Sequence, residues 1–485
     1  MNRQINSFNP RLAGGAPDLS PSGYAGIDAY VISQMRRLNL PGIALGIVSG
    51  DRIVHLRGFG RARPGGGAPS PQTPFFIGSL TKSFTALGVM QLAEAGKVGL
   101  DAPVERYLPW FRARLKGSGE PARLTVRQLL NQTGGLPLFP GWALTADFDD
   151  RPDAAERQAR SLAPFTLARP PGAAFEYSNL NYNLLGLIIE AASGEPYPDY
   201  IQKHIFNPLQ MRRSHTAKAA ARRDGLATGH RTWFGFPVPA PDLPVPRGSL
   251  PSGQLISSAE DLCHYMIACL NGGRYGQARV LSPEGMEEMF RPAADTAVPG
   301  YDRTAYGMGW YIGEQGRLKV IHHSGLTPDF FASIVMLPDQ KKGLVLLANA
   351  DHFLMQPIMA EVEAGLARLL AGEPAGPIRW GPLAWLTRGL LVLPAMQIVE
   401  VAAALRGLRG GRAGRKSGWG RRVLLPAVPH LLASLTLIPA LGPLRGFLQL
   451  FAPDFSWLAR VCGGFGVVWM VLRAGLLLRA GRRGR

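Results

Sequence analysis

The chain has 485 residues, of which 46% are hydrophobic and 18% are charged, a balance that excludes an intrinsically disordered protein. Its 53 Lys and Arg against 34 Asp and Glu give a net charge of +19, which on its own would suit a nucleic-acid-binding protein. Because residues 381–485 hold 15 of the basic residues and only two acids, and so +13 of the charge, the excess belongs to the tail, and we expect no nucleic-acid partner.

The first part of the chain contains a segment without clear periodicity, residues 1–25, and then a β-hairpin. Residues 42–60 form two runs of β-forming residues joined at Ser49-Gly50-Asp51, a sequence typical of a tight turn. The following stretch, 61–74, is rich in Gly and Pro and predicts a long surface connection.

The middle of the chain is predominantly helical. Periodic apolar residues predict helices at 82–95, 125–132, 181–193 and 258–270. The Pro-rich stretch 236–251 predicts a second long surface connection.

Strands return before the tail. They are predicted at 306–312, 319–323, 331–337 and 343–349, with a turn at 338–340, and a helix follows at 355–370. Strands at both ends with helices between them predict one antiparallel sheet built from both ends of the domain, with a helical lobe inserted. The fold class is therefore α/β (α+β), in a domain that covers residues 26–375.

Residues 382–485 have the composition of a membrane domain. Three largely apolar stretches, 390–405, 423–441 and 461–478, have about the length of transmembrane helices. Several prolines lie within them, which membrane helices tolerate when neighbouring helices satisfy the freed carbonyls. We predict three spans that contact membrane lipid; two spans with an interfacial segment, or a hairpin of buried soluble helices, are the alternatives.

Charge predicts the orientation of these spans. The connection 406–422 carries seven Lys or Arg and no acid, and four Arg follow residue 478. With three spans both clusters lie on one side, which the positive-inside rule makes cytoplasmic. We therefore expect a multi-pass protein of the cell membrane with its catalytic domain on the outer face. Residues 1–24 contain no apolar signal segment, so either the natural start lies upstream, which we favour, or the orientation is inverted.

Ser79-Leu80-Thr81-Lys82 opens the helix predicted at 82–95. Ser79 and Lys82 are three residues apart, so their side chains project from the same face of the first turn. A serine hydroxyl needs a base to become a nucleophile, and a buried lysine with a lowered pKa can serve. The rest of this helix is apolar nearly all round, which predicts a buried helix. A serine N-cap followed by a surface lysine is the plain structural alternative.

Two further motifs follow the serine. Tyr177-Ser178-Asn179 precedes the helix predicted at 181–193; a tyrosine near a lysine can relay a proton, and an Asn amide can hold the lysine or a substrate carbonyl. His323-Ser324-Gly325 ends a predicted strand, and its glycine allows close approach of a ligand. Taken singly, the first motif is also explained by an aromatic packing residue beside a helix cap, and the second by a strand that ends in a Gly loop.

The cysteines and histidines indicate no metal site. Cys263, Cys269 and Cys462 form no CxxC pair, and the nine histidines include no HExxH motif. A zinc site needs at least three suitably spaced ligands. We expect no metal and no cofactor.

Together the three motifs resemble the signatures of the serine β-lactamase and penicillin-binding-protein superfamily, S-x-x-K, Y-x-N and K-T-G or H-x-G. The resemblance is to its class C-like branch of D-amino-acid peptidases, esterases and β-lactamase-related hydrolases. It covers residues from about 26 to 372 and includes the sequence around the motifs at 76–78, 126–136 and 256–262. It implies an antiparallel sheet flanked by helices, an all-helical lobe, and an active site in the cleft between them.

The resemblance also implies roles for individual residues. Ser79 would be the nucleophile, Lys82 its base, and Tyr177 a proton shuttle. Substrate binding would fall to Asn179, His323, Ser324 and Gly325. The backbone N–H groups of Ser79 and Leu326 would form the oxyanion hole. His323 stands where true β-lactamases usually carry a lysine, which anchors the substrate carboxylate, so we expect weak or no β-lactamase activity.

The implied function is that of a membrane-anchored serine hydrolase that forms an acyl-enzyme. Its substrate would be an ester or a D-amino-acid-containing peptide or amide, including cell-wall-derived compounds. The alternative is a membrane sensor of penicillin or peptidoglycan fragments, acylated at Ser79 without efficient turnover. An α/β-hydrolase is excluded because the chain contains no G-x-S-x-G pentad.

Overall fold

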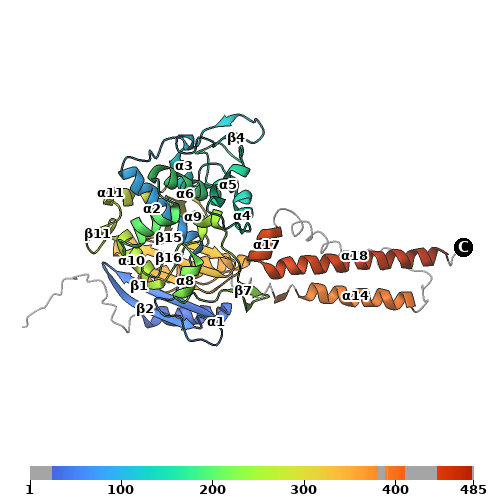
Figure 1. The fold of residues 1–485 in the computed structure, drawn as a ribbon. Helices are drawn as coiled ribbons and strands as arrows, with labels where there is room; N and C mark the ends of the chain where they lie inside the picture. The colour runs from blue at the N-terminus through green and yellow to red at the C-terminus, as the bar shows by residue number, and fades with distance from the viewer. Residues whose placement is uncertain (1–23, 381–387, 390, 410–444, 483–485) are drawn as a thin grey trace, which may run out of the picture.

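The computed structural model describes residues 24–380, 388–389, 391–409 and 445–482. Figure 1 shows a mixed α/β body from which two long C-terminal helices extend side by side. The predicted segment 1–25, apart from its last two residues, and the predicted span 423–441 lie outside the described residues.

An eight-stranded antiparallel sheet forms the centre of the body, as the sequence predicted. Its strands come from both ends of the domain, and β1 lies between β2 and β17; Leu45 pairs with Leu346 across the β1–β17 junction. In spatial order the strands are β12 (Ala294–Thr296), β13 (Arg303–Tyr306), β14 (Tyr311–Gln315), β15 (Leu318–Thr327), β16 (Phe330–Leu337), β17 (Lys342–Ala348), β1 (Gly42–Ser49) and β2 (Arg52–Gly60).

Helices bury both faces of the sheet, which explains why its central strands are continuously apolar. In β1, Ile43, Leu45 and Ile47 face one core, whereas Ala44 and Val48 face the other, because side chains alternate along a strand. The first core is completed by α1 (Ala25–Leu38) and α12 (Gln356–Leu370), and the second by α2 (Thr81–Glu94) and α10 (Ala259–Leu270).

A helical lobe lies beyond α2, at the top of Figure 1. Its helices are α3 (Val126–Leu130), α4 (Leu138–Leu144), α5 (Ala154–Ser161), α6 (Asn179–Ser193) and α7 (Tyr197–Ile201), with the small sheet β5 (Pro121–Ala122), β4 (Ala113–Leu115) and β6 (Phe165–Leu167). Helix α6 packs against α2 and so joins the lobe to the body. The predicted helical lobe is therefore present.

Shorter elements connect the lobe and the sheet. They are β3 (Phe75–Phe76) paired with β9 (Ile256–Ser257), the sheet of β18 (Ala350–Asp351), β7 (His230–Trp233) and β8 (Phe236–Pro239), the hairpin of β10 (Arg274–Tyr275) and β11 (Ala278–Arg279), and the helices α8 (Lys218–Arg223), α9 (Leu250–Gly253) and α11 (Pro283–Met289).

Two local predictions were wrong. Residues 306–312 are not one strand: the chain reverses between β13 and β14, where the Gly307 N–H donates to the Trp310 carbonyl and Gly309 adopts φ +78°. The stretch 236–251 is not only a surface connection, because it ends in α9, whose Leu250 and Pro251 are buried. Its prolines suggested a loop, but Pro251 lies in the first turn of α9, a position that proline tolerates.

The C-terminal region forms α14 (Val392–Arg409), α17 (Arg445–Phe451) and α18 (Pro453–Arg482). Among the described residues, one helical segment, Pro453–Leu472, is long and apolar enough to cross a membrane, with a mean hydropathy of 1.5. The apolar segment Val392–Ala402 of α14 is shorter. The number of spans, their orientation and the domain boundaries stay predictions.

A buried histidine–carboxylate hydrogen bond ties α12 to the sheet. Glu363 Oε1 lies 2.5 Å from His322 Nδ1 on β15, and the Ser333 hydroxyl donates to Oε2 at 2.5 Å. Both side chains of the pair are at most 3% exposed. Removing the Glu363 carboxylate would leave His322 Nδ1 and the Ser333 hydroxyl buried without this acceptor, which costs about 1–3 kcal/mol for each group.

We therefore expect Glu363→Ala to lower the free energy of unfolding by about 2–6 kcal/mol, the cost of two buried donors without a partner. Glu373→Ala is the control, because Glu373 pairs with Arg368 at an exposed site and should cost no more than about 1 kcal/mol. Urea denaturation of both variants measures the difference; equal losses would mean that the buried pair contributes nothing special.

Candidate active site

Ser79 lies in a 3₁₀ turn, Gly78–Leu80, that leads directly into α2. Lys82 is the second residue of α2 and is completely buried. The three-residue spacing brings its Nζ to 2.9 Å from Ser79 Oγ, as the motif predicted. A nucleophile and a base thus lie within hydrogen-bond distance before any substrate binds.

The surroundings of Lys82 favour an uncharged amine. Burial lowers its pKa well below the ordinary value of 10.5. Its other two neighbours are acceptors, Asn179 Oδ1 at 2.8 Å and the Ser252 carbonyl at 2.7 Å. A neutral amine has two N–H donors and one lone pair, so it can donate to these two oxygens and accept the Ser79 proton. The position thus has the hydrogen-bonding pattern of a general base.

Tyr177 and Asn179 lie at the start of α6. The helix begins at Asn179, two residues earlier than predicted, and this first turn aims the Asn179 amide at Lys82. The Tyr177 hydroxyl lies near Ser79, and Lys82 Nζ lies 4.8 Å from the centre of the Tyr177 ring. Burial raises the pKa of Tyr177 above its ordinary value, which keeps the phenol protonated. Such a phenol can pass a proton between Ser79 and a leaving group.

His323 is buried in the middle of β15, next to Tyr306. The strand continues to Thr327, so the prediction that it ends at His323 was wrong, because pairing with β16 extends through Gly325. Its Nδ1 lies 2.6 Å from the Ser324 carbonyl, so Nδ1 carries the proton and Nε2 accepts from the Tyr306 hydroxyl at 3.2 Å. Burial lowers the pKa of His323 to about 3. The imidazole is therefore neutral at pH 7 and offers no positive charge to a substrate carboxylate.

Two glycines bring the predicted oxyanion donors together. Gly78 has φ +51°, and a Cβ there would lie 2.2 Å from Leu326 N. A Cβ on Gly325 would lie 1.9 Å from the Ile77 carbonyl oxygen and 2.8 Å from Ser79 N. Only glycine at both positions lets the Ser79 turn lie directly on β15, which brings the Ser79 and Leu326 amides close together.

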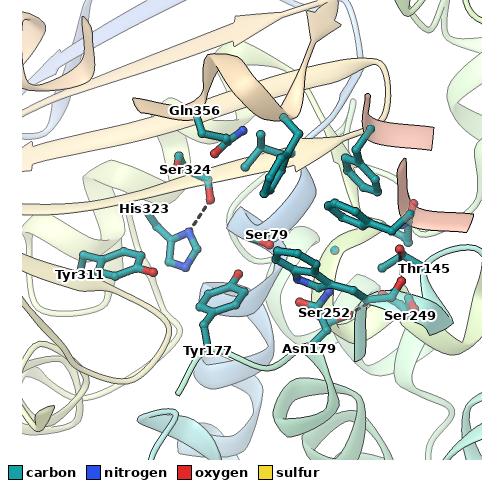
Figure 2. A pocket seen from close by; sticks show the side chains of 17 residues that line it. Ser79, Thr145, Tyr177, Asn179, Ser249, Ser252, Tyr311, His323, Ser324 and Gln356 are labelled. Carbon is teal, nitrogen blue, oxygen red and sulfur yellow. Dashed lines mark hydrogen bonds between the residues drawn. The ribbon is translucent and has the colours of Figure 1, made fainter. Parts of the chain in front are cut away.

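A cavity of about 230 Å³ opens above these residues (Figure 2). All the predicted site residues line it except the buried Lys82 and Gly325. Neither Lys nor Arg is among the lining residues. In the described part of the chain no group of three or more His, Cys, Asp or Glu lies close enough together to hold a metal ion. The lining is Ser79, Trp142, Thr145, Tyr177, Asn179, Ser249, Ser252, Gly253, Gln254, Tyr311, His323, Ser324, Leu326, Phe353, Gln356, Phe447 and Phe451.

Sequence reasoning missed part of this site. Ser252 supplies the third partner of Lys82 through its backbone, which no side-chain motif can signal. The aromatic residues Trp142, Phe353, Phe447 and Phe451 come from three distant segments, the last two from α17 in the predicted membrane domain. The only signal was the density of aromatic residues in 445–451, which the hydropathy of the tail obscured.

The fold and the site together define a mixed α/β protein with a serine–lysine pair suited to acyl transfer. The sequence profile of the family described as Beta-lactamase matches residues 27–367, so the chain belongs to this family. The predicted resemblance is thereby confirmed at the level of the family.

Individual relatives agree with this assignment. Protein flp of Staphylococcus aureus (strain MW2) is 28% identical over 334 residues, 67% of this chain and 63% of its own length, so the chain spans less than two thirds of that relative. A putative penicillin-binding protein, PbpX, of Bacillus subtilis (strain 168) is 30% identical over 285 residues, 58% of this chain and 64% of its own length.

Two solved structures are similar. The octameric penicillin-binding protein homologue from Pyrococcus abyssi has a TM-score of 0.63 at 28% identity and covers 77% of this chain and 81% of its own. EstCE1, a hydrolase with promiscuous acyltransferase activity, has a TM-score of 0.62 at 22% identity, over 73% of this chain and 99% of its own, and supports the fold. The findings together place this chain in the family described as Beta-lactamase and support its fold.

Proposed function

We propose that this chain is a membrane-anchored serine hydrolase that acts through an acyl-enzyme on Ser79. Lys82 takes the proton of Ser79, Tyr177 passes a proton to the leaving group, and Asn179 holds Lys82 and the substrate. The amides of Ser79 and Leu326 stabilise the oxyanion. The observation that carries this proposal is the fully buried Lys82, whose Nζ lies 2.9 Å from Ser79 Oγ.

The substrate is an ester or a D-amino-acid-containing peptide or amide, and β-lactamase activity is weak or absent. Support for this comes from the charge of the site: His323 is neutral, and neither Lys nor Arg lines the cavity. A carboxylate of a β-lactam would therefore lose its hydration without gaining an ion pair, which disfavours its binding.

Membrane anchoring through the C-terminal tail is part of the proposal. It is supported by the apolar segment Pro453–Leu472 of α18, which is long enough to cross a bilayer. We further propose several spans in the cell membrane, with the catalytic domain on the outer face, from the basic residues beside the predicted spans.

Labelling with a fluorophosphonate tests the proposed function. We expect the full-length protein, in membranes, to form a covalent adduct that Ser79→Ala abolishes, because only an activated hydroxyl attacks the phosphorus. Ser83→Ala, one turn further along α2, is the matched control and should keep the label; its hydroxyl donates to the Leu80 carbonyl instead. Equal labelling of Ser79→Ala and wild type would show that the nucleophile lies elsewhere.

A further inference from the structure

One side of the cavity is an aromatic wall that includes the C-terminal region of the chain. We use the term aromatic wall for Trp142, Phe353, Phe447 and Phe451. The Phe447 ring stacks on Trp142 at 4.3 Å between centroids and 9° between planes, and meets Phe353 edge-on at 5.2 Å. Phe451 stacks on Phe447 at 4.6 Å. All four rings line the same cavity as Ser79.

The aromatic wall is held in place by the first turn of α18. Asp454 Oδ1 lies 2.8 Å from His352 Nε2, and the two side chains are at most 4% exposed. The other carboxylate oxygen of Asp454 accepts from the Phe234 N–H at 2.9 Å. His352 Nδ1 accepts from the Leu354 N–H, which fixes the turn that carries Phe353. The tail is thus attached to the catalytic domain beside the active site, and α17 is a fixed part of the cavity.

The two ends of the cavity differ in chemistry. In Figure 2, His323 and Tyr311 lie on one side of Ser79, while Thr145 and the α17 ribbon lie on the other. Tyr177, which is proposed to pass a proton to the leaving group, also lies on the first side. On the second side the Thr145 hydroxyl donates to the Trp142 carbonyl, so its proton is already used. Aromatic faces without a cation beside them suit an uncharged apolar group.

We propose that the aromatic wall binds the aliphatic chain of an acyl group, so that the substrates are uncharged esters of medium- or long-chain carboxylic acids. This inference rests on the proposed function. Ser79 Oγ attacks the ester carbonyl, the bond to the alcohol oxygen breaks, and the alcohol leaves with the proton that Ser79 gave up. Water then cleaves the acyl-serine, which releases the carboxylic acid and restores the hydroxyl.

The position of α17 explains why such a substrate class fits this chain. The helix that forms the aromatic wall is separated by one residue, Ala452, from the segment proposed to enter the bilayer. With α18 inserted in the bilayer as proposed, the cavity would lie close to the membrane surface, where amphiphilic esters concentrate.

The test compares esters that differ only in the acyl chain. Full-length protein in phosphatidylcholine vesicles is assayed with p-nitrophenyl acetate and p-nitrophenyl octanoate, each below its solubility limit. We expect kcat/KM for the octanoate to exceed that for the acetate by about tenfold or more, because one methylene in an apolar pocket already changes kcat/KM by about tenfold. Phe447→Ala should reduce this ratio by about tenfold.

Matched variants separate packing from folding. Trp457→Ala removes another aromatic side chain of the tail, which is 39% exposed and does not line the cavity, and should keep the wild-type ratio. Trp142→Leu alters a residue of the aromatic wall that belongs to the catalytic domain. It should reduce the octanoate-to-acetate ratio of kcat/KM, and it provides the test if Phe447→Ala does not fold.

The outcomes distinguish this inference from the proposed function. A ratio near one in the wild type, or an unchanged ratio in both Phe447→Ala and Trp142→Leu, overturns the acyl-chain site while Ser79 still reacts with a fluorophosphonate. If Ser79 is not labelled and neither ester is cleaved, the proposed function itself is wrong.

Discussion

Replacing Lys82 by methionine should reduce kcat/KM for an ester at least about 10³-fold, in the range expected for loss of a general base that is also part of the nucleophile's activation. Methionine keeps the apolar stem but removes the group 2.9 Å from Ser79 Oγ. Lys97→Met is the control. Lys97 is exposed and follows the C-terminal end of α2, so this variant should keep activity. Steady-state hydrolysis of p-nitrophenyl acetate measures both.

Lys82→Arg separates a base from a fixed charge. Arginine stays protonated in proteins, so a role as base predicts the same loss as with methionine, whereas a purely electrostatic role predicts retained activity.

The pH dependence of kcat/KM in the wild type tests the same role of Lys82. The amine is competent only when neutral, and its pKa is lowered, so kcat/KM should rise with pH through an apparent pKa well below 10.5 and then level off. His323 stays neutral above its pKa of about 3 and should add no second step between pH 5 and 9.

The features that were predicted from the sequence depend on residues that are neighbours in the chain, whereas most of those that were missed depend on contacts between distant segments. The β-hairpin of β1 and β2 and the helix α12 were predicted because apolar periodicity and turn residues are local signals. The break between β13 and β14 was missed, although Gly307 and Gly309 mark the turn, because the aromatic and apolar residues around them read as one continuous strand.

The same distinction applies to the site. Ser79, Lys82, Tyr177 and Asn179 were found from short motifs. The fold brings Lys82 within hydrogen-bond distance of Ser79 and Asn179 and places the Tyr177 ring beside it. The carbonyl of Ser252 and the aromatic wall were not found. A contact made by a backbone carbonyl does not depend on the residue type, so no sequence motif indicates it. The aromatic wall is assembled from segments that lie up to about 300 residues apart in the sequence. Its α17 residues were assigned to the membrane tail on hydropathy, which cannot distinguish lipid contact from contact with a cavity.

A single methyl group at Gly325 should separate the site's two backbone segments. The new Cβ of Gly325→Ala would lie 1.9 Å from the Ile77 oxygen and 2.8 Å from Ser79 N, and neither backbone atom can turn away as a flexible side chain would. β15 and the Ser79 turn must therefore move apart, which displaces the Leu326 amide from the oxyanion position. Losing one such donor costs about 10²–10³-fold in kcat.

We expect Gly325→Ala to show that loss of kcat together with a decrease of about 1–3 kcal/mol in the free energy of unfolding, the usual cost of overpacking. Gly67→Ala is the control, since a Cβ at Gly67 meets nothing within 4 Å and should change neither quantity. Burst kinetics with p-nitrophenyl acetate and urea denaturation measure the two effects separately. Wild-type kcat in a folded Gly325→Ala variant would mean that β15 does not supply an oxyanion donor. A loss of stability without a loss of kcat would limit Gly325 to packing, because the two amides would then not need their close approach for acyl transfer.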